Sequence, residues 1–219
     1  MPVLSVVCVS LCALWLTLVV TAQFLTPGQS LLRMGMSGLA VGRHGWAMKA
    51  AFAARGAAAC ALAAALPGAL YPGWRLTAGF VLLWVWGVSS VLLALYDTDM
   101  PGDSPSRHGR AHVLIAVAAY LAALAAVLVL SRALPRLSGV AGPSLWAMPL
   151  AIAVAVSALV QFIAFGQQAR AAAAGAAPSG PEGAAAAPRA AGIGAYAGLL
   201  QRVFIGLMML WTVLAAVSF

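Results

Sequence analysis

The fold is decided by residues 76–130, which read LTAGFVLLWVWGVSSVLLALYDTDMPGDSPSRHGRAHVLIAVAAYLAALAAVLVL. This segment contains two apolar stretches, residues 76–96 and 111–130. Each reaches the roughly 20 residues that a helix needs to cross the hydrocarbon core of a bilayer. The segment between them holds acids, histidines and turn-forming Pro and Gly residues. The pattern predicts two membrane-spanning helices joined by a polar loop at one membrane face.

The rest of the chain repeats this pattern, with further apolar stretches at residues 3–24, 46–66, 145–165 and 196–219. Of the 219 residues, 64% are hydrophobic and only 7% are charged, whereas soluble domains carry about a quarter charged residues. We therefore predict an all-α fold: a polytopic membrane helix bundle of about six transmembrane helices, forming one domain over residues 1–219. Residues 167–194, rich in Ala, Gly and Pro, are predicted to form a flexible linker.

The basic residues indicate how the chain is oriented. Twelve Lys and Arg outnumber four Asp and Glu, but they are scattered singly between apolar segments, which argues against a nucleic-acid partner. More of them follow the first, third and fifth spans than the even-numbered ones. The positive-inside rule therefore predicts a multi-pass protein of the cell membrane with its odd-numbered loops in the cytoplasm. The lipid bilayer is the expected partner, and the sequence carries no signal for an oligomeric state.

Most of the titratable side chains belong to the odd-numbered loops or to the helix starts beside them: the acids Asp97, Asp99 and Asp103 and the histidines His44, His108 and His112. If the fourth span is helical from about Arg107, His108 and His112 stand four residues apart on one helix face. That spacing allows both imidazoles to hold one zinc ion, with Asp99 as an oxygen ligand. In this interpretation Asp97, Asp99, His108 and His112 are catalytic, and the metal activates water for attack on a lipid ester, amide or phosphate.

A second interpretation gives the same residues structural roles. Asp103, Ser104 and Ser106 are residue types that cap the start of a helix. Asp97 and Asp99 then form ion pairs with the arginines of the same loop, Arg107 and Arg110. No catalytic chemistry follows from this arrangement.

A third interpretation is a binding or proton-handling site without metal. Its residues are Ser37, His44, Arg55 and Arg110, which accompany the Asp and His side chains and engage a lipid headgroup or a small substrate. The residues alone leave the three interpretations open, so they do not decide whether the protein is an enzyme.

Arg55 lies within the apolar part of the second span, where a guanidinium is expensive unless it finds a partner or reaches the headgroups. We predict that it pairs with Asp97 or Asp99, because the start of span two and the end of span three share a face. A transporter would show paired charges deep in several spans, and only Arg55 meets that description. Four tryptophans are expected to face lipid or the membrane interface: Trp84, Trp86, Trp146 and Trp211.

Several short motifs resemble an uncharacterised prokaryotic membrane family catalogued as domain of unknown function 998, which is distantly similar to the Frag1/DRAM/Sfk1 multi-pass proteins. They are Ser37-Gly38-Leu39-Ala40, Gly45-Trp46-Ala47-Met48 with Phe52, Tyr96-Asp97-Thr98-Asp99 with Pro101-Gly102, and His108-Gly109-x-x-His112. The resemblance implies about six helices and a polar signature in the first and third loops. It names no activity, so the leading expectation is a multi-pass membrane protein with an interfacial Asp/His site. A metal-dependent membrane hydrolase and a small transporter are the alternatives.

Overall fold

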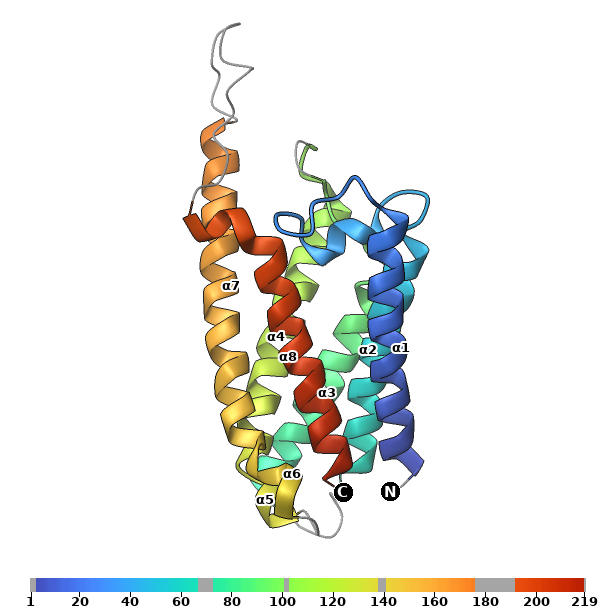
Figure 1. The fold of residues 1–219 in the computed structure, drawn as a ribbon, viewed down its shortest axis with the longest axis vertical. Coiled ribbons are helices and arrows are strands. Elements are labelled where there is room, and N and C mark those ends of the chain that lie inside the picture. The colour runs from blue at the N-terminus through green and yellow to red at the C-terminus, as the bar shows by residue number, and fades with distance from the viewer. Residues whose placement is uncertain (1–2, 67–72, 101–102, 138–140, 176–191, 219) are drawn as a thin grey trace, which may run out of the picture.

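Six long helices dominate the computed structural model, which describes residues 3–66, 73–100, 103–137, 141–175 and 192–218 (Figure 1). Each of the six is long and apolar enough to cross a membrane. They are α1 (Val3–Leu25), α2 (Trp46–Ala65), α3 (Trp74–Leu92), α4 (Arg107–Ser131), α7 (Ala147–Gly175) and α8 (Ala197–Val217). No strand occurs in the described ranges. The predicted all-α membrane bundle is confirmed.

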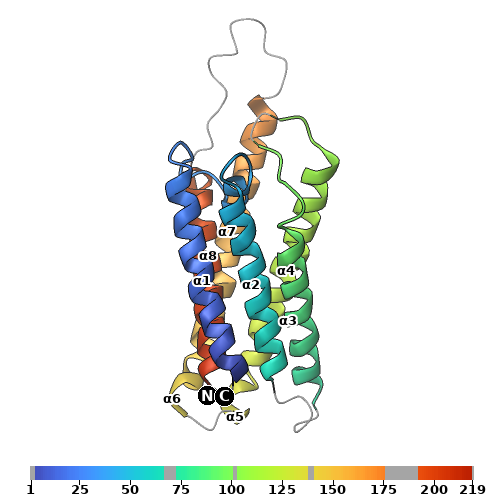
Figure 2. The same cartoon turned by 90° about the vertical axis from the view of Figure 1, so that its right-hand side faces the viewer.

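Short helices lie at the two ends of the bundle (Figures 1 and 2). The 3₁₀ helices η1 (Met36–Ala40) and η3 (Gly192–Tyr196) lie at the end where α4 begins. We call this end the η1 face. The short helices α5 (Leu134–Leu137) and α6 (Ala141–Leu145) lie at the opposite end, together with both chain termini. The odd-numbered connections, which carry the candidate site residues, therefore share one face.

Helix α2 packs between α1 and α3. Its contact with α3 is a backbone contact between two glycines: a Cβ added to Gly56 would lie 2.5 Å from the carbonyl oxygen of Gly87. Small residues of this kind allow close helix approach where lipid offers no hydrophobic driving force. The two glycines therefore fix the level at which α2 and α3 meet.

A buried hydrogen-bond network joins three other helices near the opposite end of the bundle. Trp211 of α8 donates its indole N–H to Ser131 Oγ of α4 at 2.8 Å. The Ser131 hydroxyl is in turn 2.6 Å from the carbonyl oxygen of Val127 in its own helix and 3.1 Å from the carbonyl oxygen of Ala147 in α7, so it shares its proton between them. Each such interhelical bond in a membrane stabilises the bundle by about 0.6 kcal/mol on average. Trp211 is fully buried, and so is Trp86, so the expectation that these two tryptophans face lipid is wrong.

Several helix ends differ from the predicted spans. Helix α3 ends at Leu92, before its apolar stretch ends. Helix α4 begins at Arg107, before its apolar stretch begins. Helix α7 continues to Gly175, so the first part of the predicted linker is helical. The linker's end, from Gly192, belongs to η3, and residues 176–191 lie outside the described residues.

Candidate functional site

His112 is the residue that joins η1 to the helices below it. The ring is 3% exposed, with Nδ1 2.7 Å from the carbonyl oxygen of Tyr96 and Nε2 2.9 Å from Ser37 Oγ. A carbonyl oxygen only accepts, so Nδ1 donates to Tyr96, and in the neutral ring Nε2 accepts from the Ser37 hydroxyl. The side chain of His112 in α4 therefore connects this helix to η1 and to Tyr96 in the segment that follows α3.

Asp99 holds the beginning of α4. Its Oδ2 accepts from the backbone N–H of Ser106 at 2.9 Å, and its Oδ1 accepts from the Ser106 hydroxyl at 2.6 Å. Ser106 Oγ in turn accepts from the N–H of Gly109 at 2.9 Å, which makes Ser106 the N-cap of the helix. The hydroxyl of Ser106, followed by its N–H, lowers the pKa of the Asp99 carboxyl below its ordinary value. The expectation that Ser106 caps this helix is confirmed.

Asp97 forms an ion pair with Lys49 of α2, with 2.7 Å between Oδ1 and Nζ. The two side chains are 53% and 36% exposed, so the pair lies at the surface of the η1 face and contributes under about 1 kcal/mol. It is the only salt bridge among the described residues. The predicted pairing of Asp97 or Asp99 with Arg55 is therefore wrong, because Arg55 lies six residues further along α2, about 9 Å deeper in the bundle.

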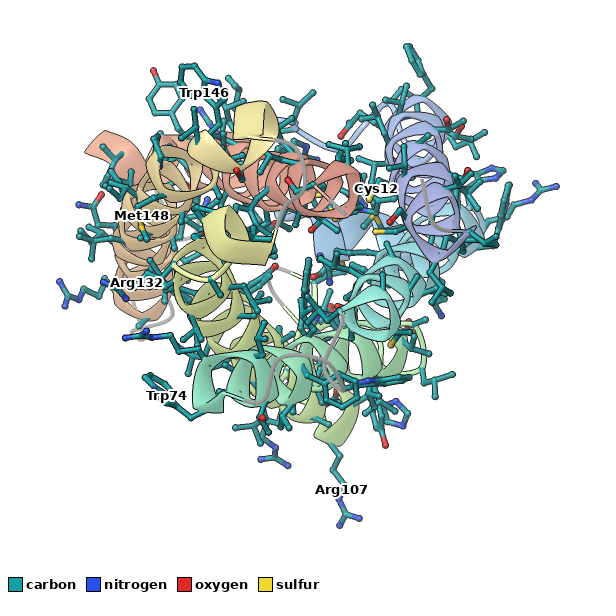
Figure 3. The ribbon with its side chains drawn as sticks, turned by 90° about the horizontal axis from the view of Figure 1, so that it is seen from below. Cys12, Trp74, Arg107, Arg132, Trp146 and Met148 are labelled. Carbon is teal, nitrogen blue, oxygen red and sulfur yellow. The ribbon has the colours of Figure 1, made fainter. Side chains whose placement is uncertain are left out.

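The arginines of the α3–α4 connection do not pair with these acids either. Arg107 and Arg110 are both exposed, and Figure 3 shows Arg107 extending away from the bundle. Arg110 acts on Asp99 only through space, as the smallest of the influences that lower its pKa. The expected ion pairs of these two arginines are therefore wrong, and Ser106 takes their place at Asp99.

The predicted zinc ligands occupy different environments. His108 is exposed and lies with its ring 5.6 Å from the ring of Tyr96. Both nitrogens of His112 and both carboxylate oxygens of Asp99 already have protein partners. Within the described ranges no three His, Cys, Asp or Glu side chains come together as a group that could hold a metal ion. The zinc site stays a prediction, and so do the catalytic roles of these residues. His44, half-buried just before α2, makes no side-chain hydrogen bond to any described residue.

Arg55 is a charged residue buried inside the helix bundle. It lies midway along α2, about 14 Å from the start of the helix, and its side chain is completely buried. None of its three guanidinium nitrogens has a hydrogen-bond partner among the residues that the structure describes. The ring centre of Phe52 is 5.4 Å from Cζ. A permanently charged group thus lies inside the bundle, where it has a cation–π contact with Phe52 and the Tyr120 hydroxyl nearby, but no counter-charge among the described residues.

Helix α4 supplies the polar surroundings of Arg55. His112 and Tyr120 both lie close enough to Arg55 to interact electrostatically with its guanidinium. The Tyr120 hydroxyl accepts from Gln201 Nε2 of α8 at 2.8 Å, and Gln201 Oε1 accepts from the backbone N–H of Met36 in η1 at 2.6 Å. A chain of polar contacts therefore leads from η1 to the neighbourhood of Arg55.

Helix α3 contributes two more buried polar groups at the same level. The indole N–H of Trp86 and the hydroxyl of Ser90 are buried and have no hydrogen-bond partner in the described part of the chain. Both belong to the buried face of α3 and flank Gly87 in the sequence. Since Gly87 touches Gly56, the neighbour of Arg55, these groups share the level of the guanidinium. The unsatisfied atoms of Arg55, Trp86 and Ser90 are mostly hydrogen-bond donors, and a ligand with acceptor oxygens would satisfy them.

Sequence reasoning selected Ser37, His112 and Arg55 but missed Gln201 and Tyr120. Both are polar residues within apolar spans, and that was the available signal. Their roles became visible only when the fold brought α4 and α8 together under η1.

Comparison with known proteins gives one result. A family model described as protein of unknown function (DUF998) matches residues 10–218, from within α1 to the end of α8. No curated protein and no solved structure matches the chain. The distant similarity to Frag1/DRAM/Sfk1 proteins stays a prediction. Because the match covers nearly the whole chain, this multi-pass membrane protein belongs to the DUF998 family of proteins of unknown function.

Proposed function

We propose that this protein binds the anionic group of a ligand, a phosphate or a carboxylate, on Arg55 beneath η1. The observation that carries the proposal is the fully buried guanidinium, which has no hydrogen-bond partner in the described ranges. Arginine does not lose its proton in proteins. Leaving a buried charge without its partner costs about 3–5 kcal/mol, so a counter-charge that enters the bundle would stabilise the protein strongly.

The chemistry of the surroundings favours an anion. Guanidinium and indole N–H groups only donate hydrogen bonds, and phosphate and carboxylate oxygens accept them. The planar fork of Arg55 matches both groups in a bidentate arrangement. The buried ring of Phe52 beside the guanidinium keeps the local dielectric low, which strengthens the attraction. A lipid headgroup or a small substrate, the two ligand classes predicted from the sequence, could each supply such an anionic group.

The position of η1 supports entry from the η1 face. Two hydrogen bonds hold η1 above the interior: His112 with Ser37, and the N–H of Met36 with Gln201. Displacement of η1 would expose Gln201 and Tyr120, the polar side chains that lead toward Arg55. His44 and Arg110 lie on the same face and bring positive or titratable side chains to the proposed entrance.

Thermal stability of the detergent-purified protein tests the proposal. Inorganic phosphate, glycerol phosphate and lysophosphatidic acid are titrated separately, with an uncharged monoacylglycerol as the lipid without an anion. We expect at least one anion to raise the melting temperature. An anion present at about 100 times its Kd would stabilise the folded protein by about 2.7 kcal/mol. A response to phosphate or glycerol phosphate identifies a small anion, and a response to lysophosphatidic acid alone identifies a lipid headgroup.

The variant Arg55→Met separates binding from a structural role. We expect it to lose the response to the anion and, without ligand, to be at least as stable as the wild type, because an uncompensated buried charge has been removed. Arg75→Met is the matched control: Arg75 is an exposed cation on α3, and its loss should leave the response intact. A wild type that no anion stabilises, or an equal response in Arg55→Met, would contradict the proposal.

A further inference from the structure

A groove of about 650 Å³ runs between α1 and α8, away from Arg55. Its walls are almost entirely apolar and come from the membrane-crossing parts of both helices. They include Cys12, Trp15 and Leu16 of α1 and Gly206, Met209 and Val213 of α8. Figure 3 shows Cys12 between these two helices. The volume lies within the range of ligand-binding pockets.

One end of the groove is polar and positively charged. Gln23 and Arg202 line it near the η1 face. Arg202 donates through Nη1 to the carbonyl oxygens of Met34 and Gly198, both at 2.9 Å, and through Nη2 to Gln23 Oε1 at 2.8 Å. No described acid neutralises it, since the one salt bridge of the described residues lies elsewhere. The half-buried guanidinium therefore keeps its full positive charge at the groove's end.

We propose that the groove holds one acyl chain of a membrane phospholipid, with the lipid phosphate on Arg202. Between Arg202 and Val213 helix α8 rises about 16 Å, so the groove follows the direction that an acyl chain takes from the headgroup region into the bilayer. The Nε–H of Arg202 makes no hydrogen bond to the described residues and is available to a phosphate oxygen. Charge complementarity at one end and apolar walls along the rest select a phospholipid.

Trp15 gives this site its own reporter. Its side chain is only 6% exposed, yet it lines the groove. A brominated acyl chain in the groove would touch the indole and quench its fluorescence, while lipid outside the groove would not reach it. The contribution of Trp15 is the difference between the wild type and Trp15→Phe.

The experiment titrates the detergent-purified protein with dibrominated phosphatidylglycerol and with a diacylglycerol that carries the same brominated chains. We expect phosphatidylglycerol to quench the Trp15 contribution at a concentration at least tenfold lower than diacylglycerol. Gly206→Leu should raise the required concentration at least tenfold, because Gly206 lines the groove and has open space at its Cβ position. The matched control Gly166→Leu, which also has open space at that position but lies on α7 outside the groove, should behave like the wild type.

The charge at the groove's end has its own variants. Arg202→Gln should remove the preference for phosphatidylglycerol, and Arg202→Lys should retain it. Equal quenching by both lipids in the wild type would overturn the proposal, and so would unchanged quenching in Gly206→Leu. A wild type that is dimeric in detergent and becomes monomeric in Gly206→Leu would assign the groove to a second copy of the chain instead.

Discussion

At the scale of single residues, the two hydrogen bonds from Ser106 to Asp99 link the stability of α4 to pH. They favour the ionised carboxylate, so the pKa of Asp99 is lower in the folded protein than its ordinary value of about 3.9 in the unfolded chain. The stabilisation is therefore fully present above about pH 4 and is lost as the pH falls through the folded-state pKa.

Asp99→Asn makes this dependence measurable. We expect the variant to melt at a lower temperature than the wild type at pH 7, and we expect the difference to shrink as the pH falls below about 4, because the wild-type carboxyl is then protonated. Melting temperatures in detergent across this range provide the measurement. Asp103→Asn is the control, since Asp103 accepts from the N–H of Met100 and does not hold Ser106. A difference that stays constant with pH would contradict the assigned role.

The residues of the η1 face show how far sequence reasoning reaches at this scale. The spacing of Asp97, Asp99, His108 and His112 correctly placed them at one end of the bundle, because spans of about 20 residues fix which loops share a face. Their partners could not be predicted. His112 binds a serine that lies 75 positions away in the sequence, and Asp97 binds Lys49 of another helix. Such pairings depend on how the helices rotate and pack.

At the scale of helices, the six membrane-spanning helices could be predicted from the sequence, but the residues at which they end could not. Hydropathy gave all six spans, but it does not mark where a helix stops. The apolar stretch of α3 runs to Tyr96, whose carbonyl oxygen accepts from His112 and not from a helical N–H. Helix α7 continues beyond its apolar stretch through Gln, Arg and Ala residues, which are good helix formers in water. Burial of Trp86 likewise followed from which face of α3 meets its neighbours.

The contact between α2 and α3 leads to a prediction about glycines. Gly56→Ala should destabilise the protein by about 1–3 kcal/mol, because its methyl group would overlap the backbone of α3 at Gly87. Gly166→Ala is the control within another long helix, where open space surrounds the Cβ position. It should leave stability unchanged or raise it by up to about 1 kcal/mol. Thermal unfolding of both variants in detergent is the measurement, and equal effects would contradict the proposed close contact.

At the scale of the whole molecule, the positive-inside rule predicts that the η1 face is cytoplasmic. Single cysteines at Ser104, on the η1 face, and at Gly73, at the opposite end, test this in a variant whose native cysteines are replaced by alanine. Both positions are exposed. We expect a membrane-impermeant maleimide to label Gly73→Cys on intact cells and Ser104→Cys only after permeabilisation. The reverse pattern would contradict the orientation.

Arg55, the fully buried Lys or Arg side chain among the described residues, lies at mid-depth in the bundle. Helix α2 carries Arg55, α4 and α8 carry the polar chain that leads to it, and η1 covers the end from which that chain starts. The three guanidinium nitrogens of Arg55 have no acceptor among the protein groups that the structure describes. An anion bound there is the central claim.

An experimental density map of the protein in nanodiscs of cell-derived lipids tests that claim most directly. We predict non-protein density beside Arg55, with an acceptor atom within about 3 Å of the guanidinium nitrogens. The same density should be missing from a map of Arg55→Met prepared in parallel. A guanidinium that is hydrogen-bonded only to protein groups, or one that extends to the membrane interface, would contradict the claim.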